Sequence, residues 1–511
     1  MKNSKYKSIF IFLNFLGYDY NEEKCESVYS RINSTGLLKF ILHFYLKFLN
    51  LFSFSNFFIN LNKNFILFKF LTGIVILVFE SPKETYIGKI ENEKNTDLNM
   101  IYDVAVVGSG PGGSIASLRS LERGKKVALI ESGAKYLPGT IEHHSLDQTT
   151  KQFKKQGLNF CFGNIPMLFT EGETYGGGSE VNSGLYFKLT EPYRSSFLRK
   201  CNIEEEEWQY YEKIVEKKIS VQKSPEGSLD NIESALLEGS QNQGLICEEV
   251  PRWRSYEPFE EHKSMQVTYL KSAEEKGLDI FTESKVIKLI PKKEFIEIIV
   301  TSEGKKSSIM AKTLVLSAGT IGTPQILKNS GLINDKIYFN FHPMNRAVVE
   351  YKNIVNDGDL FPPYQSWTTD YMYKFGYSVS TYPYVKATLA SFGKTKDLPD
   401  QEKLVGYFSS TTLENSKGRL INIFGNLTPF CYIKKKDRKK IEKGFNILRN
   451  LLKSTNINDI WPKFKASPMT TVHVFGSIPL NVSKDIGDLG ELKKDSRIKI
   501  CDASLLPQAP W

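Results

Sequence analysis

A glycine-rich turn beginning at residue 108 constrains this chain more than any other feature. Residues 101–133 read I-Y-D-V-A-V-V-G-S-G-P-G-G-S-I-A-S-L-R-S-L-E-R-G-K-K-V-A-L-I-E-S-G. The apolar run at 104–107 is typical of a buried parallel strand, and a helix and a second strand are predicted over 114–121 and 127–130. This strand–turn–helix–strand order predicts a dinucleotide-binding α/β domain.

Each position of this turn has a physical role. Gly108 permits a tight turn, Gly110 lets backbone approach a pyrophosphate, and Gly113 lets the helix pack closely on the strand. The helix N-terminus offers free N–H groups and a positive dipole end to the phosphates. Glu131 follows Gly113 by 18 positions and can accept hydrogen bonds from a ribose diol. The stretch alone does not separate NAD from FAD.

Composition narrows the class of protein. A chain of 511 residues can bury several cores, so two or three domains are expected. The net charge of +10 is modest, and the densest basic run, 434–443, continues with apolar residues at helical spacing. It predicts a solvated helix face and no nucleic-acid surface. The cysteines lack a C-x-x-C pair and predict reduced thiols, with neither a disulfide framework nor a metal site: Cys25, Cys161, Cys201, Cys247, Cys431 and Cys501.

The first hundred residues differ from the rest. Residues 37–79 are crowded with Phe, Leu and Ile and contain no Asp or Glu, but four lysines interrupt them. The cleanest apolar window, 70–79, is too short to span a bilayer alone. Three interpretations stay open: helices lying in a membrane interface, one span with Lys69 snorkelling, or helices packed on the catalytic body. The apolar residues 8–16 are followed by no typical signal cleavage site, so localisation stays open between membrane association and cytoplasm.

Two later stretches place small residues where a flat ligand could touch bare backbone. Residues 172–188 read G-E-T-Y-G-G-G-S-E-V-N-S-G-L-Y-F-K, and residues 313–332 run from a predicted buried strand into S-A-G and a helix. Ligands of parallel sheets bind at such strand ends. The candidate contact residues are Gly177, Ser179, Asn182, Ala318 and Gly319.

His473 is the histidine placed nearest to a ligand-type turn. It lies in T-T-V-H-V-F-G-S-I-P-L, an apolar and glycine-punctuated setting. Taken alone, this setting is more typical of a satisfied core histidine than of a functional one. The acidic run at 204–207 predicts a helix start, because acids in the first turn suit the helix dipole.

Together these motifs resemble the glucose–methanol–choline (GMC) oxidoreductases. Four blocks carry the resemblance: V-V-G-S-G-P-G-G-S with Glu131; Y-G-G-G-S-E-V-N-S-G; S-A-G-T-I-G-T-P-Q-I-L-K-N-S-G; and H-V-F-G-S-I-P-L with C-D-A-S-L-L-P. Their order and spacing also match. The resemblance covers residues 103–511 and implies an α/β fold. It comprises a discontinuous Rossmann-type FAD-binding domain, an antiparallel-sheet substrate domain and, outside the resemblance, a helical hydrophobic extension.

The resemblance also implies boundaries and roles. The FAD-binding domain is predicted at 101–190, 262–334 and 466–511, the substrate domain at 191–261 and 335–465, and the extension with its linker at 1–100. Gly108, Gly110, Gly113 and Glu131 would hold the ADP half of FAD, and Gly177, Ser179 and Asn182 would line the flavin. The remaining implied residues are Val286 at the adenine, Ala318 and Gly319 at the cofactor, Asp502 and Ala503 at the ribitol or pyrophosphate, and His473 as the catalytic histidine.

Two departures from the family pattern carry expectations of their own. Some members attach the flavin to a histidine in the second block, and this chain has Val181 there, so non-covalent FAD is expected. Members also continue beyond D-A-S-x-x-P with a polar partner of the catalytic histidine and a last helix. This chain stops at Trp511, which predicts weak or absent activity of the chain as given.

The expected reaction is hydride transfer from a small-molecule alcohol to flavin N5, with His473 as base. Oxygen, a quinone or a cytochrome stays open as electron acceptor, and residues 37–79 are the candidate contact with a membrane surface. The alternative is an inactive or fragmentary flavin-binding, membrane-associated relative. A pyridine-nucleotide-linked flavin reductase would need a second dinucleotide turn and a redox C-x-x-C, and the sequence contains neither.

Overall fold

The computed structural model describes residues 89–90, 100–157, 159–165, 167–189, 191, 193–225, 231–256, 261–333, 336–353, 364–378, 382–394, 397–463 and 469–507. The hydrophobic segment 37–79 lies outside this set, so its helices and its membrane contact stay predictions. Within the described residues, the helices are too short or too polar to cross a membrane.

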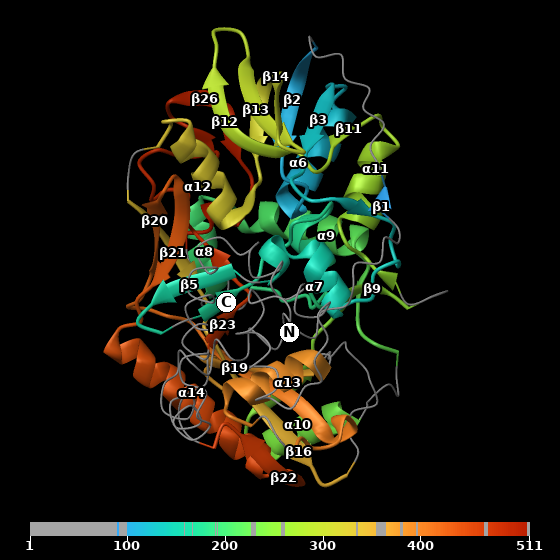
Figure 1. Cartoon of the computed structure of the whole chain (residues 1–511), viewed down its shortest axis with the longest axis vertical. Coiled ribbons are helices and arrows are strands. Elements are labelled where there is room, and N and C mark those ends of the chain that lie inside the picture. Colours follow the sequence, from blue (N-terminus) through green and yellow to red (C-terminus); the bar gives the residue numbers. More distant parts are fainter. Residues whose placement is uncertain are drawn as a thin grey trace, which may run out of the picture.

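A sheet of eight described strands forms one end of the molecule (Figure 1). Its parallel strands follow the order β11-β3-β2-β14-β26, which is the strand order of a Rossmann fold. They are β2 (Ile101–Val107), β3 (Val127–Ile130), β11 (Asp279–Phe281), β14 (Lys305–Leu316) and β26 (Asp495–Ile500). β12 (Lys285–Pro291) and β13 (Ile296–Ser302) extend β14 as an antiparallel meander, and β25 (Glu491–Leu492) pairs with β26.

Helix α6 (Pro111–Glu122) covers one face of this sheet. Val104 and Val106 of β2 pack with Leu118 on the helix side, while Ala105 and Val107 belong to the core on the other side. Both faces of the strand are therefore buried, as its continuous apolar run predicts.

A second sheet of thirteen described strands has the order β24-β15-β20-β21-β5-β6-β23-β16-β19-β18-β17-β8, with β22 beside β16. Most of its pairs are antiparallel, and β21–β5 and β23–β6 are parallel. Its strands are β5 (Asn159–Gly163), β6 (Met167–Phe169), β8 (Ile246–Glu249), β15 (Ile337–Phe341), β16 (Met344–Tyr351), β17 (Tyr364–Trp367), β18 (Tyr373–Ser378), β19 (Leu404–Thr411), β20 (Gly418–Ile423), β21 (Asn426–Cys431), β22 (Ile457–Trp461), β23 (Met469–Thr471) and β24 (Val474–Phe475).

Helices cover both faces of this second sheet. On one face, Ala347 and Val349 of β16 pack with Phe445 and Leu448 of α14 (Lys435–Lys453), and α10 (Asn231–Asn242) joins them. On the other face, α13 (Tyr382–Ser391) packs on Val348. The helix predicted from the basic run at 434–443 is confirmed, because its apolar residues are buried.

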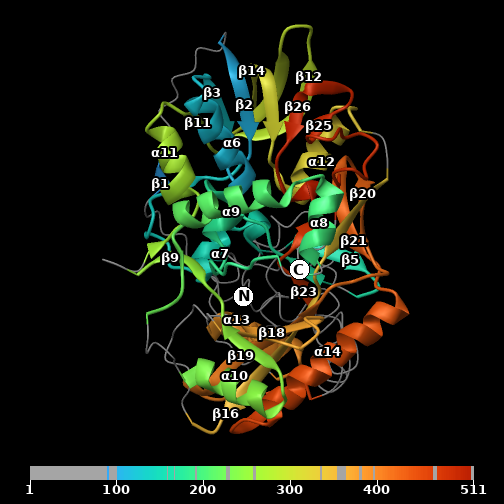
Figure 2. The ribbon, with the colours of Figure 1, turned by 180° about the vertical axis from the view of Figure 1, so that it is seen from behind.

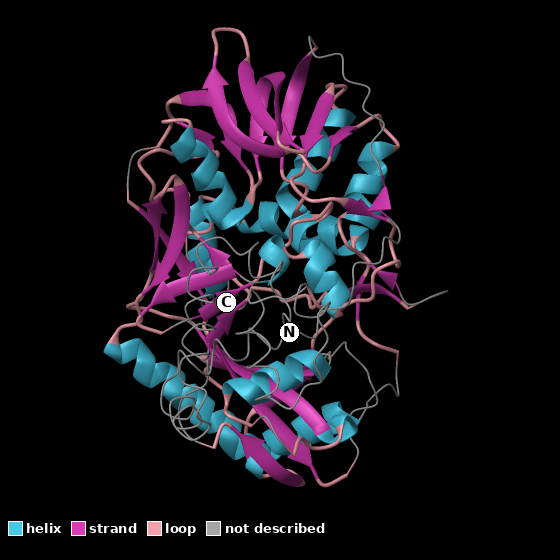
Figure 3. Cartoon of the chain, in the orientation of Figure 1, coloured by secondary structure: helices cyan, strands magenta, loops and turns pink. Residues whose placement is uncertain are grey.

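The remaining elements connect the two sheets, and Figure 3 shows helices filling the region between the strands. Seen from behind, α8 (Tyr193–Cys201) and α9 (Glu205–Lys218) cross this middle region (Figure 2). The start of α9 confirms the helix start predicted from the acidic run. The others are α7 (Leu146–Gln152), α11 (Lys271–Glu274), α12 (Gly319–Asn329), β1 (Lys89–Ile90), β4 (Lys135–Tyr136), β7 (Val221–Gln222), β9 (Arg252–Ser255) and β10 (Glu261–His262), with short turns of helix at Lys154–Gly157, Gly177–Glu180, Gln266–Leu270, Gln401–Lys403 and Ala503–Leu505.

The sequence placed residues 159–169 with the nucleotide domain, but β5 and β6 pair within the second sheet. β5 lies beside β21 and β6 lies beside β23, so both belong to the layer that carries the candidate histidine. Their buried Phe160, Cys161 and Met167 supply the apolar contacts that favour this position. Strand pairing across more than 250 residues decided their place, and local sequence holds no sign of it.

Candidate active site

Three turns meet where β2 and β14 end. They are the turns that follow β2 after Val107, β14 after Leu316 and β26 after Ile500. Gly108 has φ +95°, and a Cβ there would lie 2.2 Å from the carbonyl oxygen of Ser317. A Cβ on Gly112 would lie 1.7 Å from the carbonyl oxygen of Cys501. The Ser317 hydroxyl donates to that same Cys501 carbonyl at 2.6 Å. The strand order reverses between β2 and β14, which is where ligands of open α/β sheets bind.

The N-terminus of α6 is free to meet an anion. Gly110 is the N-cap and supplies no capping side chain, and Pro111 takes the first helical position. A Cβ on Gly113 would lie 1.9 Å from the Gly108 carbonyl oxygen, so the helix packs directly on the turn. A Cβ on Gly110 would meet no atom of the described chain within 4 Å. Open space beside uncapped N–H groups fits the pyrophosphate of a dinucleotide.

The carboxylate of Glu131 is hydrogen-bonded to the glycine turn and stabilises its conformation. One carboxylate oxygen accepts hydrogen bonds from the Ser109 backbone N–H at 2.9 Å and the Ser109 hydroxyl at 2.6 Å. The other oxygen accepts from the Gly133 N–H at 2.8 Å. Burial raises the pKa of this carboxyl. Its contact with a ribose stays a prediction, whereas its bond to Ser109, which sequence reasoning missed, holds the turn.

The second glycine block docks on the first. Gly177 has φ +59°, and a Cβ there would lie 2.8 Å from the Gly110 Cα. The Ser109 hydroxyl accepts from the Gly176 N–H at 2.9 Å. In the same block, the Ser179 hydroxyl donates to the Gly176 carbonyl and the Asn182 side chain accepts from Gly184 N–H. The structure therefore brings the two predicted blocks together.

Asp502, in the turn after β26, is hydrogen-bonded to the turn that follows β14 and to the start of α12. Its carboxylate accepts from the Gly319 N–H at 2.9 Å, the Thr323 hydroxyl at 2.5 Å and the Ser504 N–H at 2.8 Å. Burial raises its pKa. Val286 is buried in β12, two residues beyond Ser284, whose N–H donates to the Glu131 carbonyl oxygen at 2.9 Å. These contacts bring the first glycine block, the second glycine block and the Gly319 and Asp502 turns together, and Val286 lies on the strand that follows Ser284.

His473 lies between β23 and β24, on a segment attached to the Asp502 turn. The Gly476 N–H donates to the Ala503 carbonyl at 2.8 Å, which ties the residues after His473 to this turn. The imidazole is accessible to solvent although protein surrounds it closely. Burial, and then the charge of Lys374, lower its pKa to about 4. The ring is therefore neutral near pH 7 and has a lone pair that can accept a proton.

A second histidine that the sequence reasoning missed contacts the first. Nδ1 of His342 lies 3.2 Å from Nδ1 of His473, and His342 is 1% exposed. Burial, followed by the electrostatic effects of His473 and Lys374, lowers the pKa of His342 well below its usual range. The turn between β15 and β16 positions it. In the sequence, the one sign of this histidine was that His342 and Pro343 follow directly after the mostly apolar residues 337–341.

Lys374, on strand β18, is an electrostatic neighbour of both His342 and His473. It is 8% exposed on β18, and its Nζ lies 3.4 Å from the centroid of the Phe187 ring. Burial lowers its pKa to about 7. Neighbours Tyr373 and Phe375 pack into the opposite core, so strand alternation directs Lys374 to the other face. A lysine inside an otherwise apolar alternating strand was the signal in the sequence.

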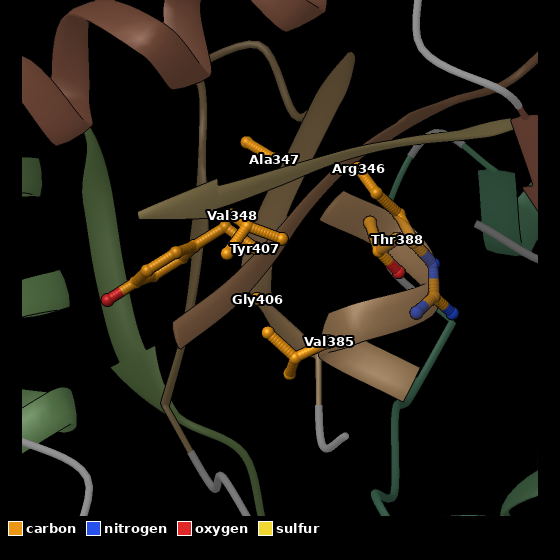
Figure 4. A pocket seen from close by; sticks show the side chains of 7 residues that line it. All are labelled: Arg346, Ala347, Val348, Val385, Thr388, Gly406 and Tyr407. Carbon is orange, nitrogen blue, oxygen red and sulfur yellow. The ribbon is translucent and has the colours of Figure 1, made fainter. Parts of the chain in front are cut away.

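A small cavity lies elsewhere on the second sheet (Figure 4). It sits between β16, β19 and α13, and Figure 4 shows Arg346 reaching toward Thr388 at its edge. Nε of Arg346 donates to the Thr470 hydroxyl at 3.3 Å. The lining residues are Arg346, Ala347, Val348, Val385, Thr388, Gly406 and Tyr407. The predicted cofactor and catalytic residues are not among them.

Comparisons with known proteins agree with this geometry. Residues 112–344 match the family model described as GMC oxidoreductase. Over these residues the chain is similar to the GMC oxidoreductases. The chain is 22% identical to an uncharacterized GMC-type oxidoreductase of Sinorhizobium fredii over 469 residues, which is 81% of this chain and 92% of that protein.

Other relatives share less of their length. A long-chain-alcohol oxidase of Arabidopsis thaliana is 27% identical over 276 residues, covering 47% of this chain. The alignment spans about a third of the plant enzyme, 36%. Pyridoxine 4-oxidase from Mesorbium loti has a similar fold, with a TM-score of 0.65, 13% identity, and coverage of 80% of this chain and 95% of that one. Aspergillus oryzae formate oxidase also has a similar fold, with a TM-score of 0.63, 11% identity, and coverage of 80% of this chain and 94% of that one.

A buried carboxyl in the second block gives a pH-dependent prediction. Burial raises the pKa of Glu180 to about 7 from an ordinary 4.5. The folded state therefore holds its proton more tightly than the unfolded state, so a cost to folding develops as pH rises from 4.5 to 7 and is full above pH 7. That cost is about 3 kcal/mol. Glu180→Gln should raise the urea midpoint of the cofactor-free protein at pH 8 and change it little at pH 5.

The matched control for this substitution is the exposed Glu142. Glu142→Gln removes an equal charge from the surface and should shift the midpoint slightly and equally at both pH values. If Glu180→Gln shifts the midpoint by the same amount at pH 5 and pH 8, Glu180 does not titrate in this range in the folded protein.

Proposed function

We propose that this chain is an FAD-dependent oxidoreductase that acts on CH–OH groups and converts a small-molecule alcohol to a carbonyl, with His473 as the base. One observation carries the proposal: His473 sits on a segment that is hydrogen-bonded to the Asp502–Ala503 turn, and that turn closes the three-turn junction. A neutral imidazole is thereby placed beside a site that fits a dinucleotide.

The chain's own residues bind, orient and accept a proton. Uncapped N–H groups at the start of α6 bind phosphate, and Glu131 keeps the turn in shape through Ser109. His342 contacts Nδ1 of His473 and orients the imidazole, and we assign Nε2 of His473 to take the hydroxyl proton of the alcohol. FAD, when bound, supplies the hydride acceptor. Val181 offers no atom for a covalent link, so the cofactor is held non-covalently.

The relatives support the substrate class. The Arabidopsis proteins are named long-chain-alcohol oxidases, and pyridoxine 4-oxidase shares the fold over most of both chains. The identity of the alcohol and of the electron acceptor (oxygen, a quinone or a cytochrome) is not specified by the residues of the junction. Membrane-surface contact through residues 37–79 remains a separate prediction.

An anaerobic titration tests the proposal. The purified protein, reconstituted with FAD, is mixed with a panel of primary and secondary alcohols, and absorbance at ~450 nm is followed, since flavin reduction bleaches this band. Bleaching by at least one alcohol, at whatever rate, would support the proposal. Acid precipitation of the same sample should leave the yellow colour in the supernatant. FAD binding without bleaching by any alcohol would favour a flavin-binding protein without this activity, and colour in the pellet would contradict non-covalent attachment.

A further inference from the structure

Two cysteines far apart in the sequence touch in the core. Sγ of Cys161 on β5 lies 2.7 Å from Sγ of Cys431 at the end of β21, and each residue is 1% exposed. Both belong to the same apolar cluster, and both are free thiols in this structure. The sequence predicts reduced core or surface thiols, and it does not predict that Cys161 and Cys431 are in contact.

Contacts on both sides hold the two strand segments together. β5 and β21 pair in parallel, with Phe162 opposite Phe430 and their ring centroids 5.4 Å apart. Just beyond the cysteines, the Asn164 side chain donates to the Ile433 carbonyl and accepts from the Ile433 N–H, each at 2.9 Å. The backbones of the two cysteines are therefore held side by side, and the sulfurs need to approach by only about 0.7 Å to reach bonding distance.

We propose that Cys161 and Cys431 are a redox pair that forms a reversible disulfide between β5 and β21. With a peroxide as oxidant, one thiolate attacks a peroxide oxygen to give a sulfenic acid and release water, and the second thiol displaces the sulfenic oxygen as water. Two thiols and one hydrogen peroxide give one disulfide and two waters. A dithiol reductant reverses the bond by exchange.

The bond would brace the layer that carries His473. β5 pairs with β6, with Cys161 opposite Met167, and β6 pairs with β23, which runs directly into His473. Burial raises the pKa of the Cys431 thiol, so thiolate is scarce and the folded protein reacts slowly. The pair, which is almost completely buried, therefore fits a structural lock and does not fit a fast sensor.

Thiol counting tests this inference on the full-length, FAD-reconstituted protein. The fully reduced protein has six thiols. After overnight exposure to millimolar hydrogen peroxide, alkylation in denaturant should detect four, and a dithiol reductant should restore six. Peptide mapping without reductant should show one linked pair containing Cys161 and Cys431. Thermal unfolding of the oxidised protein should shift upward by several degrees relative to the reduced protein.

Two variants complete the design. Cys431→Ser should keep all five of its thiols after peroxide and lose the thermal shift, while Cys247→Ser should still lose two. Folding of each variant is checked by circular dichroism before oxidation, and Cys161→Ser serves in place of Cys431→Ser if the latter does not fold. Six thiols after peroxide, over-oxidation of single cysteines without a link, or a link between any other two cysteines would overturn the proposal.

Discussion

Replacing His473 with Gln should slow flavin reduction by an alcohol by about 10²–10⁴-fold, the range in which a general base contributes. Gln keeps a polar group of similar reach but cannot accept and hold the proton. FAD occupancy should be unchanged, since the chain's contacts at the glycine turns do not involve this side chain. The measurement is the stopped-flow rate of bleaching at ~450 nm under anaerobic conditions, with an alcohol that reduces the parent protein.

The pH dependence and a neighbouring variant make this prediction specific. Because the surrounding protein and then the charge of Lys374 lower the pKa of His473, the parent rate should fall from protonation of this base only below the ordinary histidine range. Val472, also exposed beside His473, is the matched control, and Val472→Ala should change the rate only slightly. Equal rates for His473→Gln and the parent protein would remove His473 from the chemistry.

Local sequence patterns predicted the parts of the site that depend on one strand and one turn. Gly108 and Ala318 each lie in the turn after a strand, Gly113 lies in the first turn of the helix that follows, and hydrophobic periodicity locates such strand ends. The strand order β11-β3-β2-β14-β26 then brings these ends to one junction. The family resemblance supplied the roles, because spacing alone could not distinguish FAD from NAD.

Local sequence patterns could not predict contacts between segments that are distant in the sequence. His342 and His473 meet because β15 pairs with β24, and Lys374 faces them because of its register on β18. Cys161 and Cys431 are 270 positions apart. In each case the partner depends on strand register in the second sheet, and a single sequence specifies register only weakly where several apolar strands can pair.

Gly110→Ala should abolish tight FAD binding while leaving the fold of the cofactor-free protein intact. Gly110 has φ −64° and ψ −175°, which alanine adopts without strain, and its added Cβ would meet no atom of the described chain within 4 Å. The methyl group would instead occupy the space where the pyrophosphate approaches the uncapped N–H groups. Losing two charge-assisted hydrogen bonds at about 1.5 kcal/mol each would weaken binding by about 10²-fold.

Gly113→Ala, three positions further along in the first turn of α6, provides the contrast that decides what the glycine turn does. Its Cβ would lie 1.9 Å from the Gly108 carbonyl oxygen, so this variant should unfold at lower temperature even without FAD. Fluorescence titration with FAD and thermal unfolding of the cofactor-free protein separate the two effects. Gly110→Ala should lose affinity with an unchanged unfolding temperature, whereas Gly113→Ala should lose both. If Gly110→Ala binds FAD as the parent does, the pyrophosphate does not lie against this turn, and the uncapped N-terminus of α6 has some other role.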